Sequence, residues 1–433
     1  MDRNTTITIA TAGALLGVGA TLAAQHLLST PTTTSKSKSS KIKTEDEVEL
    51  KEDIRNGLEE CIGDTPLILL KSLSAATGCE ILGKAEFLNP GGSVKDRVAL
   101  HLLTTAERDG LLTPHSGDKI YEGTVGSTGV SLAYLARARG YLAHIVMPSD
   151  QSIEKSSLLE KLGAEVSRVP PASIVDQSQF VNKARSLALE HTMREDIPGR
   201  GYFADQFEND GNWRAHYAST APEIYRQTGG RVDAFVAGAG TGGTISGCAR
   251  YLKERLPEMR VVLADPPGSG LFNRVKYGVM FDIKEREGTR RRHQVDTIVE
   301  GIGINRVTHN FEAGRELVDD AVRVTDEEAM AMARFLVEKE GLFVGSSSAV
   351  NCVAAVRAAK KLGEGHRVVT ILCDSGARHL SKFWAKAGNV GGGWEMTLDD
   401  VLDAGIQKKG MDKKEEELRK EEEKAEFVEF EKK

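Results

Sequence analysis

The sequence predicts an α/β protein with two doubly wound domains and a ligand cleft between them. Short β-rich runs alternate with longer helical stretches along most of the 433 residues, and such alternation is typical of parallel sheets covered by helices. Gly238, Gly240 and Gly243 follow one of these runs at G-x-G-x-x-G spacing, where a strand would turn into a helix. The alternating region covers residues 50–394, which is too long for one sheet of ordinary size.

The expected strands are short apolar runs, and each is followed by a stretch in which apolar residues have helical spacing. They occupy residues 80–87, 119–123, 143–148, 164–169, 232–240, 260–266 and 367–374. Residues 131–140 and 327–341 are examples of the helical stretches. We expect a smaller subdomain over residues 88–210 and a larger one from the rest of residues 50–394. Ligands of such sheets bind beyond the carboxyl ends of the strands, so the turns there form the candidate site.

Composition excludes several classes of function. The net charge of -6 is small for this length and gives no basic footprint for nucleic acid. The 5 cysteines are scattered and include no C-x-x-C pair, so neither a disulfide framework nor a zinc site is predicted. We therefore expect free thiols in a reducing compartment, no metal and no nucleic-acid partner.

The two ends of the chain differ from its middle. Residues 1–49 are expected to be a membrane anchor and a basic linker, because residues 6–28 carry no Asp, Glu, Lys or Arg and would extend about 34 Å as a helix, enough to cross a bilayer core. The lysines that follow place the bulk of the chain in the cytosol; they are Lys36, Lys38, Lys41 and Lys43. We expect the mitochondrial outer membrane, with the endoplasmic reticulum membrane or a cleaved secretory peptide as alternatives. Residues 395–433 predict a charged tail.

The glycine-rich turn at residues 240–244 predicts an anion site. Backbone N–H groups at a helix N-terminus bind phosphate, whichever molecule carries it. Asp265 lies about 20 residues further on, so the spacing also fits a nicotinamide dinucleotide site. A tight strand-to-helix turn without a ligand is the third interpretation, and the turn alone leaves all three open.

Three further helix starts carry small or basic residues. Residues 124–128 follow one expected strand, and residues 344–355 place three serines before another helix. Such N-termini suit carboxylate and phosphate groups, although Ser and Thr are also ordinary helix caps. Lys95 opens a fourth helix, where a charged ammonium is disfavoured and the pKa of the amine should fall. A lowered pKa suits a Schiff-base lysine, and a surface lysine paired with Asp96 is the alternative.

Four ordered motifs give the chain a family resemblance. NPGGSVKDRVAL at residues 89–100 is followed by EGTVGSTG at 122–129, GAGTGGTISG at 238–247 and VGSSSA at 344–349. In this order and spacing, residues 62–384 resemble the cysteine synthase and cystathionine β-synthase family, which are pyridoxal-phosphate enzymes of fold type II. Within that family the chain resembles a membrane-anchored, cysteine synthase 2-like branch.

The resemblance implies a cofactor and the residues that bind it. Lys95 would form a Schiff base with the aldehyde of pyridoxal 5′-phosphate, and Ser347 would face its pyridine nitrogen. The residues implied for the phosphate are Gly240, Thr241, Gly242, Gly243 and Thr244. Those implied for the substrate carboxylate are Thr124, Val125, Gly126, Ser127 and Thr128.

Three positions depart from the family pattern. Ser127 stands where the family usually has an asparagine that bonds the cofactor 3-oxygen and supports the substrate. Val125 stands where a serine is usual, and Ser348 where a glycine is usual. The departures bear on substrate and rate rather than on cofactor binding.

The resemblance also implies a reaction. It is a β-replacement that converts O-acetyl-L-serine and sulfide, or another thiol, with Lys95 as the base at Cα and with L-cysteine and acetate as products. The alternatives are an enzyme similar to cystathionine β-synthase, one similar to serine or threonine dehydratase, and a cofactor-binding, weakly active membrane scaffold. A nicotinamide-dependent dehydrogenase is the more distant alternative. A homodimer is also implied.

Overall fold

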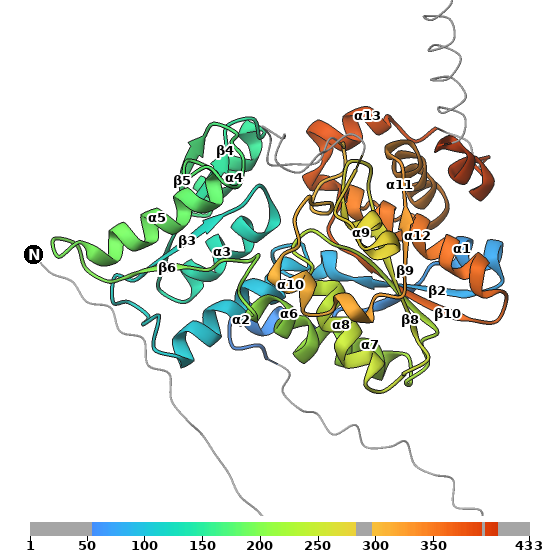
Figure 1. The fold of residues 1–433 in the computed structure, drawn as a ribbon, viewed down its shortest axis with the longest axis horizontal. Helices are drawn as coiled ribbons and strands as arrows, with labels where there is room; N and C mark the ends of the chain where they lie inside the picture. Colours follow the sequence, from blue (N-terminus) through green and yellow to red (C-terminus); the bar gives the residue numbers. More distant parts are fainter. Residues whose placement is uncertain (1–53, 283–296, 392–394, 406–433) are drawn as a thin grey trace, which may run out of the picture. The chain divides into compact units, whose positions relative to one another are not determined.

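The structure is a computed structural model that describes residues 54–282, 297–391 and 395–405. The described residues from Ile54 onward belong to one compact unit, which contains two β-sheets with helices around them (Figure 1). The predicted α/β class is confirmed. The four-stranded sheet comes from residues 119–203, and the division of the chain into a smaller and a larger subdomain stays a prediction.

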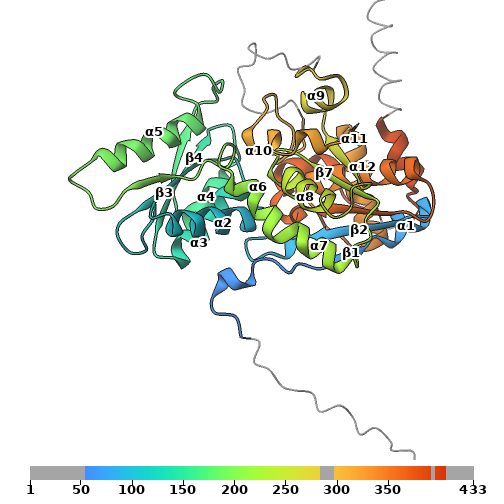
Figure 2. The ribbon, with the colours of Figure 1, turned by 60° about the horizontal axis from the view of Figure 1, so that its bottom comes forward.

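The four-stranded sheet is parallel throughout and has the strand order β5-β4-β3-β6. Its strands are β3 (Lys119–Gly123), β4 (Leu142–Pro148), β5 (Glu165–Val169) and β6 (Gly201–Phe203). Side chains of α2 (Lys95–Arg108), α3 (Ser127–Ala138) and α4 (Ile153–Lys161) pack on one face. α5 (Phe180–Met193) packs on the other face, so the sheet is covered on both sides (Figure 2).

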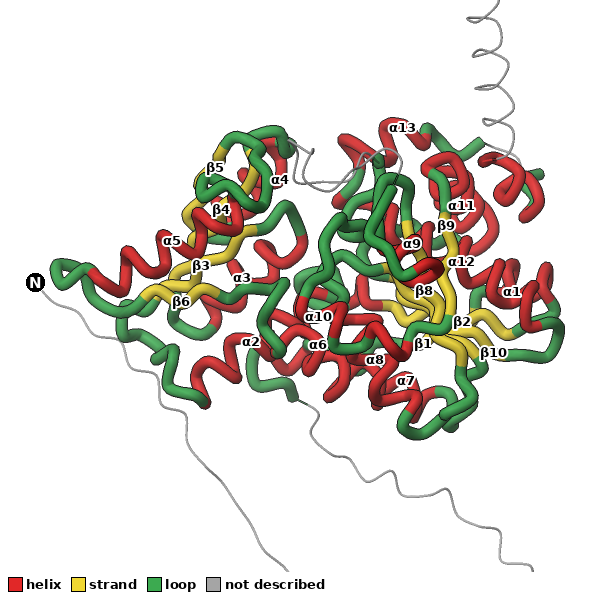
Figure 3. The backbone as a smooth tube through the Cα atoms, in the orientation of Figure 1, coloured by secondary structure: helices red, strands yellow, loops and turns green. Residues whose placement is uncertain are grey.

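The six-stranded sheet has the order β1-β2-β10-β7-β8-β9, and only β1 in it is antiparallel to its neighbour. Its strands are β1 (Leu67–Leu69), β2 (Glu80–Ala85), β7 (Ala234–Gly238), β8 (Arg260–Asp265), β9 (Asp320–Arg323) and β10 (Arg367–Leu372). β2 pairs with β10, so an early and a late segment of the described chain lie side by side in this sheet (Figure 3). In the sequence, the strands of the four-stranded sheet come between β2 and β7.

Side chains along the central strands point alternately to the two faces of the six-stranded sheet, and both sets are apolar, so helices cover both faces. In β7, Ala234 and Val236 pack with α1 (Lys71–Thr77), α11 (Asp326–Glu340) and α12 (Ser346–Leu362). Phe235 and Ala237 pack on the other face with α7 (Ala221–Gln227) and α8 (Gly243–Lys253). The remaining α-helices are α6 (Gly211–Ala215), α9 (Leu271–Tyr277), α10 (His309–Glu312) and α13 (Ala385–Ala387). Short 3-10 and π segments are η1 (Leu58–Cys61), η2 (Glu86–Leu88), η3 (His216–Thr220), η4 (Arg315–Leu317), η5 (Gly376–Arg378) and η6 (Leu380–Trp384).

Every predicted strand run contains a strand, and three observed strands were not predicted. These are β1, β6 and β9, which have only three or four residues each. A segment that short cannot show a hydrophobic period, so its pairing is decided by the neighbouring strand rather than by its own pattern.

The predicted membrane location is wrong for the chain as described. None of the described helices is both long and apolar enough to cross a bilayer. A span needs about 20 apolar residues, and α12, at 17 residues, is the longest of the α-helices bounded above. The predicted span at residues 6–28, like the rest of the predicted anchor and linker up to residue 49, lies outside the described residues.

The chain continues to pack after the predicted end of the folded region. Residues 398–405 are helical, and Leu398 and Val401 are buried in the same cluster as α11 and α12. The Met396 N–H donates to the Glu338 carboxylate at 3.1 Å. The first residues of the predicted charged tail therefore belong to the core, and residues 406–433 lie outside the described part of the chain.

A buried ion-pair network joins α2 to the six-stranded sheet. The Arg97 guanidinium donates to both carboxylate oxygens of Glu86, at 2.7 and 2.8 Å, and to both of Glu223, at 2.6 and 2.7 Å. Lys84, on β2, donates to Glu223 at 2.6 Å and to the Thr65 carbonyl oxygen at 2.6 Å. Burial would raise the pKa of Glu223, but the two cations outweigh it and lower that pKa to about 2. The four charges balance, and they fix the first turn of α2.

Replacing Arg97 tests this network. We expect Arg97→Met to lower the free energy of unfolding by about 3–5 kcal/mol, because two buried carboxylates lose their main partner. Urea unfolding followed by circular dichroism measures the change. The control is Arg194→Met, since Arg194 and its partner Asp196 are both exposed, and it should leave the midpoint close to that of the wild type. A loss for Arg97→Met no larger than that of the control would contradict the role given to the network.

Candidate active site

Four helix N-termini open onto one cavity of about 590 Å³ between the two sheets. They are the first residues of α2, α3, α8 and α12. The N-cap residues of these helices make no side-chain cap, although the Lys95 N–H of α2 donates to the Ser93 hydroxyl at 3.2 Å. The free N–H groups and positive dipole ends of such helices favour anionic groups. The arrangement therefore suits a small ligand with more than one negatively charged group.

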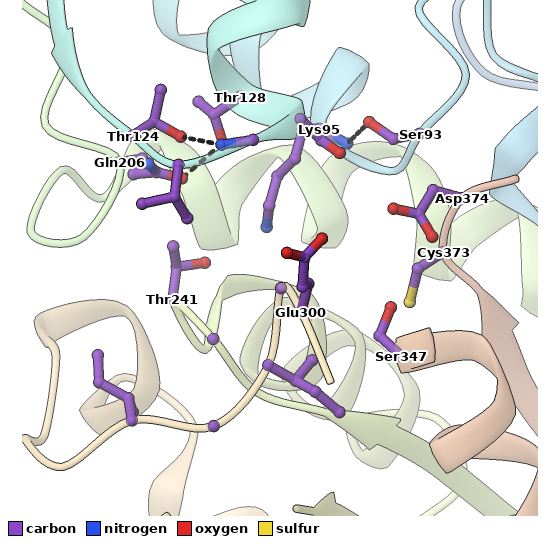
Figure 4. A pocket seen from close by; sticks show the side chains of 18 of the residues that line it. Ser93, Lys95, Thr124, Thr128, Gln206, Thr241, Glu300, Ser347, Cys373 and Asp374 are labelled. Atoms are coloured by element: carbon purple, nitrogen blue, oxygen red, sulfur yellow. Dashed lines mark hydrogen bonds between the residues drawn. The ribbon is translucent and has the colours of Figure 1, made fainter. Parts of the chain in front are cut away.

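Lys95 lies at the mouth of α2 and extends into the cavity, with Thr124 and Thr128 on one side and Ser347, Cys373 and Asp374 on the other (Figure 4). Burial lowers the pKa of Lys95, and the nearby Cys373 and Asp374 only partly oppose that effect. The direction agrees with the sequence prediction, and burial is its main cause.

The backbone on either side of Lys95 is fixed by other elements. The Val94 N–H donates to the Cys373 carbonyl oxygen at 3.0 Å, which ties the helix start to the end of β10. The alternative pairing of Lys95 with Asp96 does not occur. Asp96 is buried and accepts hydrogen bonds from the Gly91 N–H at 2.6 Å and from the Ser131 hydroxyl at 2.5 Å.

The turn at residues 240–244 is shaped by its glycines. Gly242 has a φ of +85°, which favours glycine, and a Cβ there would lie 2.4 Å from the Cβ of Phe311. A Cβ on Gly240 would lie 2.3 Å from the Gly301 carbonyl oxygen. Gly243 does not line the cavity, because it begins α8 against Asn212, whose Oδ1 would lie 2.0 Å from a Cβ. Close packing of the turn on its neighbours therefore requires glycine at all three positions.

The two threonines of that turn are held from behind. The Asn212 amide donates to the Thr241 hydroxyl at 2.9 Å, and the Thr244 hydroxyl lies 3.2 Å from Nε2 of His216. Burial lowers the pKa of His216 well below its ordinary value, and the positive charge of Lys95 adds to that effect. A neutral imidazole therefore supports this end of the cavity.

The turn at residues 124–128 forms the opposite wall. The Gly126 N–H donates to the Thr124 hydroxyl at 3.3 Å, and the Thr128 hydroxyl donates to the Gln206 side chain at 2.6 Å. Val125, Gly126 and Ser127 line the cavity between these two threonines. Sequence reasoning did not single out Gln206, which is far from the turn in sequence and has no motif of its own.

The three serines at the start of α12 have different surroundings. The Ser346 hydroxyl accepts from the Glu300 N–H at 3.0 Å, and the Ser348 hydroxyl accepts from the Cys373 N–H at 2.8 Å. Ser347 lines the cavity. Ser348, one of the departures from the family pattern, therefore supports the end of β10, and Ser347 is the serine that faces a ligand.

A charged cluster that the sequence did not predict lies at the cavity wall. Glu300 contacts Lys155 of α4 at 3.0 Å and Nδ1 of His379 at 3.3 Å, and Nε2 of His379 contacts Asp374 at 2.9 Å. Burial would lower the pKa of His379, but the two carboxylates outweigh it and raise the pKa to about 9. The two glycines that follow Glu300, Gly301 and Gly303, are the signal that the sequence offered for this segment, and both have a positive φ.

The residues around the cavity fit pyridoxal 5′-phosphate. An amine of lowered pKa suits an aldehyde, and an uncapped helix start behind a glycine turn suits a phosphate. All the site residues predicted from sequence line the cavity except Gly243. Asp265, the acid expected for a dinucleotide, is buried at the end of β8, where one carboxylate oxygen accepts from the Phe272 N–H at 2.8 Å, and it does not line the cavity. The dinucleotide alternative therefore loses its ribose ligand.

Known proteins resemble the chain over most of its length. A family profile described as "Pyridoxal-phosphate dependent enzyme" matches residues 58–374. Cysteine synthase 2 of Emericella nidulans is 71% identical over 361 residues, which are 81% of this chain and 84% of that protein. The crystal structure of an O-acetylserine dependent cystathionine beta-synthase from Helicobacter pylori matches with a TM-score of 0.64 and 36% identity, over 76% of this chain and 98% of that one. An O-ureido-L-serine synthase structure matches with a TM-score of 0.66 and 31% identity, over 81% and 99%.

The His379 cluster predicts how stability depends on pH. The pKa of His379 in the folded chain, about 9, lies above the ordinary value of about 6.5. The stabilisation that its charge provides is therefore complete below about pH 6.5 and is lost as the pH rises through about 9. We expect the difference in unfolding free energy between the wild type and His379→Gln to shrink over that range, as measured by urea unfolding at a series of pH values.

The control for this prediction is His366→Gln. His366 contacts the Gly363 carbonyl oxygen through Nδ1 and lies outside the cavity lining. Its replacement measures what the loss of an imidazole outside the cluster costs, and the His379→Gln series is compared with it at each pH. A constant difference between wild type and His379→Gln from pH 6 to pH 10 would show that His379 is not held as a cation.

Proposed function

Because the chain belongs to the family of pyridoxal-phosphate dependent enzymes, we propose that it is a cysteine synthase. The predicted family and its cofactor, pyridoxal 5′-phosphate, are confirmed. The reaction takes O-acetyl-L-serine and hydrogen sulfide to L-cysteine and acetate: the C–O bond at Cβ breaks, a C–S bond forms, and acetate leaves. The 71% identity to a relative named cysteine synthase 2 carries this choice of reaction.

Lys95 has two tasks in the proposal. The bound cofactor supplies an electron sink, which makes the Cα proton of an attached amino acid removable. Lys95 holds the cofactor before the substrate arrives and then, as a free amine, takes the Cα proton. Burial favours the neutral amine, which is the form that accepts a proton. The same amine returns the proton to Cα after sulfide has replaced acetate.

The helix starts around Lys95 divide the remaining tasks. Residues Gly240, Thr241, Gly242 and Thr244 hold the phosphate, with Gly243 giving the turn its close packing on α6. Ser347 would serve the pyridine nitrogen as a neutral hydrogen-bonding group. The substrate carboxylate binds at the opposite wall, at the start of α3. The residues proposed for it are Thr124, Val125, Gly126, Ser127 and Thr128.

A larger thiol is the second nucleophile to consider. The Helicobacter pylori protein, which this chain matches along 98% of its length, is an O-acetylserine dependent cystathionine beta-synthase. The same O-acetylserine chemistry with a thiol in place of sulfide would give a longer thioether product. A homodimer, which the family resemblance implies, stays a prediction.

Replacing Lys95 tests the proposal. Purified wild-type protein should convert O-acetyl-L-serine and sulfide to L-cysteine, and kcat of Lys95→Ala should fall by at least about 100-fold, because its general base is lost. Lys183→Ala, at an exposed lysine on α5, is the control and should keep wild-type kcat. Product is measured by chromatography, and L-serine and L-threonine are tested separately as alternative substrates. Full activity of Lys95→Ala, or turnover of serine or threonine without any cysteine formation, would exclude the proposed function.

A further inference from the structure

Arg378 connects the two walls of the cavity. It is the last residue of η5, which follows β10, and its guanidinium reaches the opposite wall. One nitrogen, Nη1, donates to the Ser127 hydroxyl at 3.2 Å, and Nη2 donates to the Gly91 carbonyl oxygen. Arg378 is half-buried and lines the cavity together with Lys95 and Ser127.

The surroundings of Arg378 hold its guanidinium in place. Its charge lies close enough to the buried Asp96 carboxylate to oppose the rise in pKa that burial causes there. Asp96 is itself fixed by the Gly91 N–H and the Ser131 hydroxyl. Arg378 is therefore anchored on the side of the Gly91 turn, and its other end is presented to Ser127.

This contact restricts the directions in which the Ser127 hydroxyl can donate. A serine hydroxyl has one hydrogen and two acceptor lone pairs, and a guanidinium can only donate. Ser127 must therefore accept from Arg378, so its own hydrogen points elsewhere. Among the described residues Ser127 makes no other side-chain hydrogen bond, and the residue lines the cavity. The hydrogen is thus available to a ligand, and the adjacent positive charge makes it a stronger donor.

We propose that Arg378 is a positioning residue that turns Ser127 into a fixed hydrogen-bond donor toward an anionic oxygen bound beside Lys95. The inference rests on the proposed function, because the oxygen belongs either to the cofactor ring or to the substrate carboxylate. It also gives a physical account of the Ser127 departure. A short, freely rotating hydroxyl is a poor substitute for a planar amide, and a hydroxyl with one lone pair held by Arg378 has fewer directions left in which to donate.

A second reading of the same contacts is a purely mechanical one, in which Arg378 only braces the cavity walls. The two readings differ in what Ser127 contributes. If Arg378 acts through Ser127, removing either residue removes the same hydrogen bond to the ligand, and removing both costs little more than removing one. If Arg378 is only a brace, the effects of the two replacements add.

The test compares Ser127→Ala, Arg378→Gln, Arg378→Lys and the double variant Ser127→Ala/Arg378→Gln, each loaded with pyridoxal 5′-phosphate. Three quantities are measured: the dissociation constant of the cofactor without substrate, the pH titration of its visible absorbance, and KM and kcat for O-acetyl-L-serine. We expect Ser127→Ala and Arg378→Gln each to raise either the cofactor dissociation constant or KM by about tenfold. In the double variant the same constant should be no more than about twice that of either single variant.

The readouts separate the two possible oxygens. A change in cofactor dissociation and in the absorbance titration, with KM unaltered, assigns the hydrogen bond to the cofactor. A rise in KM without a change in the absorbance titration assigns it to the substrate carboxylate. Arg378→Lys, which keeps the charge but loses the planar fork, should recover only part of the loss.

Arg334→Gln is the matched control. Arg334, on α11, donates to the Ala387 carbonyl oxygen at 2.8 Å and lies outside the cavity lining. It should alter urea stability at most, with cofactor spectrum and KM unchanged. Additive effects in the double variant, or an Arg378→Gln protein that differs from wild type only in its urea midpoint, would overturn the inference. A wild-type protein that binds no cofactor would instead overturn the proposed function.

Discussion

The ion pairs of Arg97 set the position of Lys95, and the chemistry of the cavity depends on that position. Arg97 follows Lys95 by two residues on α2 and is paired with two glutamates from the part of the chain that forms the six-stranded sheet. Shifting the start of α2 would separate buried charges, which is costly. On the other side of Lys95, the Val94 N–H is bonded to the end of β10. The amine is thus kept in a buried place that lowers its pKa, and this makes it reactive toward an aldehyde.

The electrostatics of the cavity come from backbone as much as from side chains. The four helix starts at the cavity favour anions, and His216 behind the glycine turn is neutral, so the positive potential there comes from backbone. The side-chain charges at the wall are mostly balanced among themselves, because the carboxylates of Glu300 and Asp374 face the cations of His379 and Lys155. Arg378 differs from these, because part of its guanidinium is directed at a residue that faces the ligand. The cavity therefore suits anionic groups at both walls, as the proposed phosphate and carboxylate sites require.

The backbone turns of the candidate site could be predicted from the sequence, but the side chains that support them could not. Lys95, the glycine turn and Ser347 could be placed because each sits in a motif directly at a helix start. Gln206, Glu300 and Arg378 could not, since their roles depend on tertiary contacts that no local pattern encodes. The three shortest strands were not predicted for the same reason, because their pairing is set by the neighbouring strands. The membrane prediction was wrong: it took the location of the whole protein from one uncharged run near one end of the chain, and none of the described helices could cross a bilayer.

The most direct measurement is to find where the cofactor is attached. Purified protein loaded with pyridoxal 5′-phosphate is treated with borohydride, which makes the bond between lysine and cofactor permanent, and its peptides are then analysed by mass spectrometry. The account predicts that the added mass lies on the peptide containing Lys95, and that the peptides containing Lys84 and Lys155, which form buried or cavity-wall ion pairs, carry none. Attachment at another lysine, or no attachment at all, would contradict the assignment of Lys95 and the function built on it.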